Sequence, residues 1–221
     1  MKSKRAFTII ELTIAMAFIS VLLISITVLV IRITNLYTKG STIKAVNSTA
    51  RFLIDDLQRT VAASPTPSSI RNAYRPDRNR FCTGTYSYIW NTPRGTLNSF
   101  SSPDNREELK LVKIEDSTRA YCNARADNTI PLAGAIVLLS PRDESSLILY
   151  DFAIFANDAR SINTKTRQTF YAASFVLGTR ANNGLISPTI NCIPPADSNN
   201  DFSYCSINKF NFAMISTGNT Y

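Results

Sequence analysis

The chain has 221 residues, of which 44% are hydrophobic and 18% charged, enough for one globular domain plus one further element. It contains no histidine, which removes the commonest general base and metal ligand and excludes a Ser-His-Asp enzyme. The net charge of +8 favours an anionic partner, but three of the positive residues, Lys2, Lys4 and Arg5, lie together at the N-terminus. The rest of the positive charge is scattered, apart from one later stretch.

An uncharged segment follows the basic N-terminus. From Leu12 to Ile31 no charged residue occurs over twenty positions, a helix long enough to cross a hydrocarbon layer of about 30 Å. The basic residues before it predict a cytoplasmic N-terminus, with the rest of the chain outside the cytoplasm. Because the apolar run continues into Arg32 without glycine or proline, we expect a retained anchor and not a cleaved secretory signal.

Glu11 interrupts the apolar stretch with a carboxylate. Burying such a group in lipid costs about 2–3 kcal/mol, so it predicts a partner and a purpose. Cleavage between Ala6 and Phe7 would create an α-amino group, and the N-terminus of a neighbouring subunit is the partner that we expect. Such a buried ion pair favours correct register more than it adds stability. A plain signal anchor, the alternative, leaves Glu11 unexplained.

The segment Lys4-Arg5-Ala6-Phe7-Thr8-Ile9-Ile10-Glu11-Leu12 resembles the class III signal of type IV pilins and type II secretion pseudopilins. The resemblance implies that a prepilin peptidase cuts between Ala6 and Phe7 and methylates the new N-terminus of Phe7. It also implies that Glu11 engages an adjacent subunit. The sequence departs from the family pattern at Ala6, where glycine is usual.

The family resemblance also implies partners and a location. Other pilin subunits, the prepilin peptidase and the pilus assembly platform are the expected partners, and no cofactor is expected. The chain would be a single-pass inner-membrane protein with an extracytoplasmic head domain, and then part of an extracellular filament.

An amphipathic helix is predicted to continue beyond the membrane segment. Apolar residues recur at three- and four-residue steps before Pro65 and Pro67 end the helix: Ile43, Val46, Ala50, Leu53, Leu57 and Val61. We therefore divide the chain into a leader (1–6), a transmembrane or filament-core helix (7–32), its amphipathic continuation (33–63) and a β-rich head (64–221).

Six apolar runs in the head predict strands, separated by Pro, Asn, Gly and Ser clusters. They are Thr85–Trp90, Leu109–Ile114, Ala133–Leu139, Leu147–Phe155, Phe170–Leu177 and Phe210–Ile215. We expect an antiparallel sheet packed on the helix stripe, an α+β fold of the type IV pilin-like kind, with a hairpin connection at Ser140–Ser145.

Four widely spaced cysteines, Cys82, Cys122, Cys192 and Cys205, predict disulfides and not a metal or redox site, because no Cys-x-x-Cys pair occurs. Disulfides persist outside the cytosol, in agreement with export. Three connectivities are open; we prefer Cys82 with Cys122 and Cys192 with Cys205.

The later basic stretch contains Arg71, Arg75, Arg78 and Arg80. A solvated loop is the preferred interpretation, and an anion or DNA contact is the alternative. Two carboxylate pairs, Asp55 with Asp56 and Glu107 with Glu108, would be needed for a signal-anchored extracytoplasmic enzyme. Adjacent helical residues diverge by about 100°, so we expect solvated surface and no enzyme.

The subtype rests on two observations. Between Phe7 and Lys39 there is neither proline nor glycine, which favours a minor subunit, and Ala50–Arg59 resembles minor pilins of the PilW and GspJ type. The resemblance implies filament initiation, tip function, adhesion or motility, with a host or surface ligand. A major pilin, a secretion pseudopilin and a DNA-capturing competence pilin are the alternatives.

Overall fold

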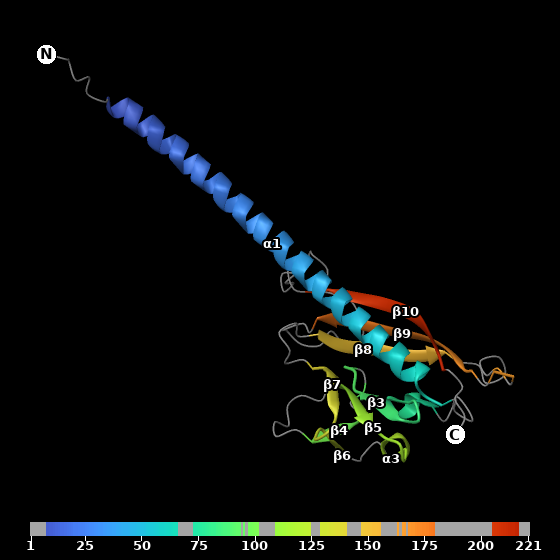
Figure 1. The fold of residues 1–221 in the computed structure, drawn as a ribbon. Coiled ribbons are helices and arrows are strands. Elements are labelled where there is room, and N and C mark those ends of the chain that lie inside the picture. The colour runs from blue at the N-terminus through green and yellow to red at the C-terminus, as the bar shows by residue number, and fades with distance from the viewer. Residues whose placement is uncertain are drawn as a thin grey trace.

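A computed structural model of the chain describes residues 8–65, 73–93, 95, 97–101, 109–124, 129–140, 147–155, 163, 165–166, 168–179 and 205–216. One long helix extends from a β-rich head, and its second half packs on the strands (Figure 1). The α+β class and the pilin-like layout are thereby confirmed. Several residues named above lie outside the described residues: Lys2, Lys4, Arg5, Ala6, Phe7, Pro67, Arg71, Glu107, Glu108 and Cys192.

Helix α1 runs without interruption over Ile9–Ala62, 54 residues or about 80 Å. It begins two residues later than the expected start at Phe7, because Thr8 is extended and caps the first turn. At the other end the N–H of Ala63 donates to the carbonyl of Arg59, and Pro65 follows. The predicted membrane segment and its amphipathic continuation therefore belong to one continuous helix.

The described strands form two antiparallel sheets and one parallel pair. A five-stranded sheet has the order β1-β2-β3-β5-β7, a three-stranded sheet the order β10-β9-β8, and β4 pairs with β6. The strands are β1 (Tyr74–Arg75), β2 (Arg80–Cys82), β3 (Tyr86–Trp90), β4 (Ser99–Ser101), β5 (Leu111–Glu115), β6 (Thr129–Pro131), β7 (Ile136–Leu139), β8 (Leu147–Phe155), β9 (Phe170–Thr179) and β10 (Ile207–Ile215). Two short helical turns lie next to β2. The turn η1 (Pro76–Arg78) precedes β2 in the sequence, and α3 (Ala120–Asn123) contacts it in space.

All six predicted strands are present, as β3, β5, β7, β8, β9 and β10, and their antiparallel pairing is divided between two sheets. The hairpin predicted at Ser140–Ser145 is wrong, because β7 pairs with β5 whereas β8 pairs with β9. Leu139 and Leu147, at the facing ends of β7 and β8, are both buried. The chain thus changes sheets there, and each sheet turns one apolar face toward α1.

The core forms where α1 meets both sheets. The predicted stripe is buried at Val46, Ala50, Leu53, Leu57 and Val61, together with aromatic residues of the strands. Ile43, the first member of the predicted stripe, remains 41% exposed because the head ends before it.

A polar clamp also joins α1 to the five-stranded sheet. Lys113 Nζ lies 2.8 Å from Asp56 Oδ1 and donates to Thr60 Oγ1, while the Tyr88 hydroxyl donates to Asp56 Oδ2 at 2.7 Å. Burial raises the pKa of Tyr88 above its ordinary value. Asp56 is therefore not the solvated surface residue that we predicted, whereas Asp55 is exposed.

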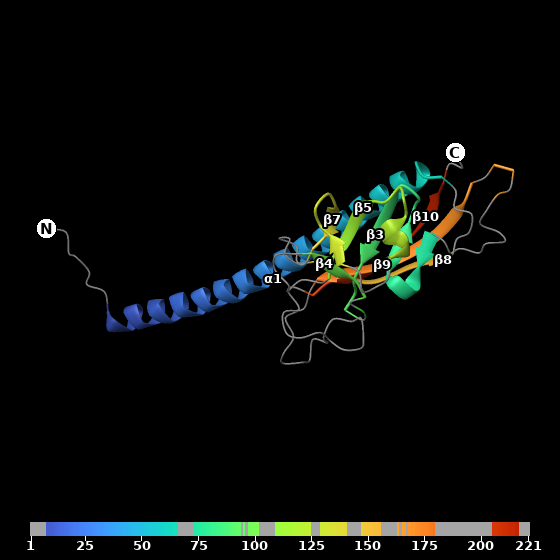
Figure 2. The same cartoon turned by 90° about the horizontal axis from the view of Figure 1, so that it is seen from below.

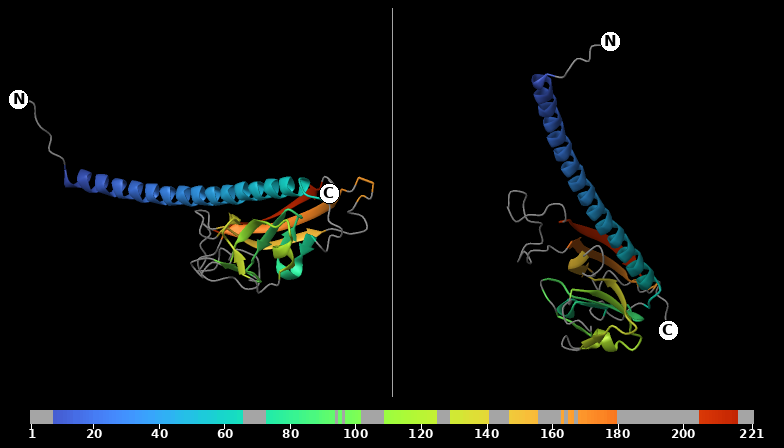
Figure 3. Two further views of the ribbon diagram at one scale, coloured as in Figure 1. Left: turned by 60° about the horizontal axis from the view of Figure 1, so that its bottom comes forward. Right: turned by 90° about the vertical axis from the view of Figure 1, so that its left-hand side faces the viewer.

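Strand β10 runs alongside α1 in the same direction. Asn208 Nδ2 approaches Asn47 Oδ1 at 3.5 Å, and Gln58 Nε2 donates to the carbonyl of Ala213 at 2.9 Å. The two contacts are five residues apart on β10 and eleven residues apart on α1. At the rise per residue of a strand and of a helix, both separations are about 17 Å, so the two elements run side by side. The end of β10 thus lies level with the end of α1, far from the N-terminus (Figure 3).

Candidate functional site

The first half of α1 stands clear of the head (Figure 2). Every residue from 8 to 37 is exposed, and the segment includes bulky apolar side chains such as Phe18 at 74% and Leu36 at 71% exposure. Among the described residues, α1 is the one helix long and apolar enough to span a membrane. Each large apolar side chain left in water costs about 1.5–3 kcal/mol, so this half of the helix requires a lipid or protein environment.

The hydroxyl groups on this half of α1 are satisfied within the helix. Ser20, Thr27 and Thr34 donate to the carbonyl groups four residues earlier at 2.8–2.9 Å, and Thr13 donates to the carbonyl of Ile10. Such bonds leave no hydroxyl unpaired in hydrocarbon. We did not identify this feature from the sequence, although the seven-residue spacing of these four residues was a visible signal.

The first turn of α1 contains a capping box formed by Thr8 and Glu11. Glu11 Oε2 accepts from the Thr8 N–H at 3.0 Å and from the Thr8 hydroxyl at 2.9 Å, and the Glu11 N–H donates to Thr8 Oγ1. We expected a partner for Glu11 in a neighbouring subunit and did not predict these bonds to Thr8. The motif Thr8-x-x-Glu11 was the missed signal. Within the described chain Oε1 accepts no hydrogen bond.

The described part of the basic stretch, Arg75, Arg78 and Arg80, belongs to the folded head and not to the solvated loop that we preferred, and Arg71 lies outside the described residues. The described part contains β1, η1 and β2, and Asn79 between the last two adopts a left-handed φ of 51°. Arg75 is half-buried opposite Arg80 in the β1–β2 pair, and its Nε has no hydrogen-bond partner among the described atoms.

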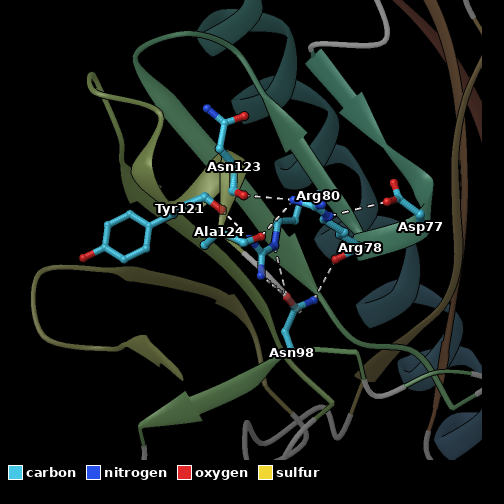
Figure 4. Close-up of polar contacts among 7 residues, drawn as sticks. All are labelled: Asp77, Arg78, Arg80, Asn98, Tyr121, Asn123 and Ala124. Atoms are coloured by element: carbon cyan, nitrogen blue, oxygen red, sulfur yellow. Dashed lines mark hydrogen bonds and ion pairs between the residues drawn. The ribbon is translucent and has the colours of Figure 1, made fainter. Parts of the chain in front are cut away.

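Arg80 is fully buried, so its predicted role in an exposed anion contact is wrong. Its guanidinium donates to Asn98 Oδ1 from Nε and Nη2, and to the carbonyl groups of Tyr121 and Ala124 from Nη1 (Figure 4). Burial lowers the pKa of Arg80, and the neighbouring Arg78 charge lowers it further. Four acceptor contacts compensate much of the cost of burying this charge.

Arg78 binds the same segment from outside. Its Nη1 donates to the carbonyl groups of Asn123 and Ala124, and its Nε lies 3.4 Å from the Asp77 carboxylate (Figure 4). These contacts hold the end of α3 against the β1–β2 region. Two of the described arginines of the stretch, Arg78 and Arg80, therefore attach the α3 segment to the rest of the head and do not form a basic surface.

The disulfide between Cys82 and Cys122 confirms the first of the two preferred pairings, with the Cα atoms 5.9 Å apart. It joins β2 to α3, at the segment that Arg78 and Arg80 also hold. Asp116 adds to this attachment, because its carboxylate accepts from the Ser87 hydroxyl and the Cys122 N–H. Cys205 is disulfide-bonded as well, and its expected partner, Cys192, lies outside the described residues.

The described geometry defines a class of protein by layout: a head fixed to the second half of a helix whose first half is apolar and exposed. This is the layout that the pilin resemblance implied. Comparisons of the chain with protein-family models, with curated proteins and with solved structures found no match.

Proposed function

We propose that the chain is a structural subunit of a type IV pilus or a related filament. One observation carries the proposal: the apolar, exposed first half of α1 is continuous with the helix that forms the core of the head. Lipid covers this half before assembly, and the equivalent helices of neighbouring subunits cover it in the filament. A single continuous helix therefore links the position of each head to the helix bundle.

Glu11 supports the same function. Its Oε2 holds the helix start through Thr8, while its Oε1 is available to a second donor. In the proposed filament that donor is the α-amino group of Phe7 in a neighbouring subunit, produced when a prepilin peptidase cuts between Ala6 and Phe7. The chain would be inserted with its N-terminus in the cytoplasm, and the assembly platform would then extract it.

A minor rather than a major subunit is the finer proposal. The uninterrupted α1 favours it, because neither proline nor glycine weakens the helix before Gly40. The DNA-capture alternative loses support, because Arg78 and Arg80 donate to the protein's own carbonyl and amide oxygen atoms. The enzyme alternative loses the Asp55 and Asp56 pair, because Asp56 is bound by Lys113 and Tyr88.

Filaments sheared from cells of the native host provide the test. We expect the chain in the sheared fraction of wild-type cells, and only in the membrane fraction of a strain that lacks prepilin peptidase, because an uncut leader prevents assembly. Equal recovery from both strains would contradict the proposal. A known periplasmic protein, absent from both sheared fractions, controls for cell lysis.

A further inference from the structure

Three apolar side chains form an exposed patch on the three-stranded sheet, far from the N-terminus. We define the distal patch as Phe155, Phe170 and Ile215, which are 61%, 48% and 52% exposed. Ile215 lies directly opposite Phe170, and Phe155 lies opposite Ala172, two residues from Phe170 on the same face. Their chain neighbours Tyr171 and Met214 are buried, so the patch faces away from the core.

The level of the distal patch along α1 follows from the contacts of β10. Gln58 bonds to Ala213, and Ile215 lies two strand residues, or about 7 Å, further on. The patch is therefore level with residues 58–62, at the last turn of the helix. It lies at the end of the head that points away from the membrane segment.

A second uncovered apolar surface lies on α1 just below the head. We define the base stripe as Leu36 and Ile43, which are 71% and 41% exposed. At seven-residue steps Leu36, Ile43, Ala50 and Leu57 lie along nearly one line of the helix, and the last two are buried in the core. The base stripe thus continues the core line of α1 beyond the part that the head covers.

Lipid covers at most part of the base stripe. If the hydrocarbon layer ends near Ile31, Ile43 lies twelve residues, or about 18 Å, beyond it. The headgroup region adds only about 5–7 Å on each side, so Ile43 projects past it. A protein surface is the remaining cover for this side chain.

We propose that the distal patch of one copy packs against the base stripe of a second copy, directly beneath the second copy's head. This inference rests on the proposed filament function. Two copies with parallel helices bring the surfaces together when one is displaced axially by about twenty residues, or about 30 Å. The second copy is the occupant because both surfaces are apolar and uncovered, and the proposed filament places copies of this chain side by side with their helices parallel. The contact joins unlike surfaces and displaces each copy along the helix axis, so repeated contacts give an open and not a closed assembly.

Disulfide trapping in intact filaments tests the contact. Two tagged copies are expressed together in the native host, one with Leu36→Cys and the other with Ile215→Cys, and sheared filaments are oxidised. The native cysteines of the described chain, Cys82, Cys122 and Cys205, are disulfide-bonded and do not compete. Because the contact raises the effective concentration of the two thiols, we expect a crosslinked dimer carrying both tags.

Tyr37→Cys, paired with the same Ile215→Cys copy, is the matched control. Tyr37 is 77% exposed at the same height but about 100° around the helix from Leu36. The Leu36 pair should give about tenfold more dimer than the Tyr37 pair. Filaments of normal yield with no dimer, or with equal dimer from both pairs, would overturn the contact and leave the filament function intact. Absence of the wild-type chain from filaments would instead reject the function on which the contact rests.

A second variant covers the case in which the cysteine substitutions themselves reduce assembly. Phe155→Ser in the distal patch is compared with Ile136→Ser, an exposed apolar residue on β7 that lies outside both surfaces. We expect Phe155→Ser to lower the filament yield about tenfold and Ile136→Ser to leave it unchanged. Equal yields from the two variants would contradict the proposal.

Discussion

Replacing Glu11 with glutamine should lower the filament yield about a hundredfold while leaving α1 capped and inserted. Glutamine still accepts from the Thr8 N–H, so the capping box remains, but the negative charge is lost. In the proposed filament this removes one member of a buried ion pair, at a cost of about 3–5 kcal/mol. Sheared filaments, quantified by immunoblot against the membrane fraction, measure the effect.

Thr8→Ala is the matched control for the Glu11 prediction. It removes the hydroxyl that bonds to Oε2 and keeps the Glu11 charge, so only a cap is weakened, by about 1 kcal/mol. We expect much smaller losses of filament than with Glu11→Gln. Wild-type assembly of the Glu11→Gln variant would contradict the ion-pair role and leave Glu11 as a capping residue alone.

Removing the disulfide by Cys82→Ala with Cys122→Ala should lower the free energy of unfolding of the head by about 4 kcal/mol. The bond closes a loop between residues 40 apart in sequence, and the loss corresponds to the chain entropy regained on unfolding. Denaturation of the full chain in detergent micelles, followed by fluorescence, measures the change. Trp90, the single tryptophan of the chain, is buried against Phe152 and reports on the core.

Asn211→Ala serves as the control for the disulfide experiment. Asn211 is exposed on β10, so its truncation should change the free energy of unfolding by no more than about 0.5 kcal/mol. A change below about 1 kcal/mol for the double cysteine variant would show that Arg78, Arg80 and Asp116 hold the α3 segment without the disulfide.

The extent of α1 was predictable because its signals are local. The apolar run, the three- and four-residue steps and Pro65 each depend on residues close together in the sequence. Both ends of α1 lie within two residues of the expected bounds, 7 and 63. The stripe was predictable for the same reason. Ile43 was the exception, because the sequence shows that a face is apolar but not how far the head extends over it.

Strand positions were predictable, whereas strand partners were not. Leu147–Phe155 matches β8 at both ends, since its composition and alternation are properties of the segment itself. The separation of β7 and β8 into different sheets depends on how each packs against α1, and no residue of either strand signals it. The short strands β1, β2, β4 and β6 carry two or three residues each and exist through tertiary contacts.

The basic stretch was misread because charge usually indicates surface. Arg80 is buried through acceptors that lie 18 and 44 residues away in sequence, on Asn98 and Ala124. No periodic or local pattern connects these positions. The capping box of Thr8 and Glu11 is a local pattern, and its three-residue spacing is visible in the sequence. We missed it because we looked for a partner of Glu11 only in a neighbouring subunit.

Mass spectrometry of the N-terminus tests the central claim most directly. The chain is extracted from membranes of its native host, from the wild type and from a strain that lacks prepilin peptidase. The account predicts a mature start at N-methylated Phe7 in the wild type and at Met1 in the mutant. A start at Met1 in both strains would contradict the filament account and reduce α1 to a plain signal anchor.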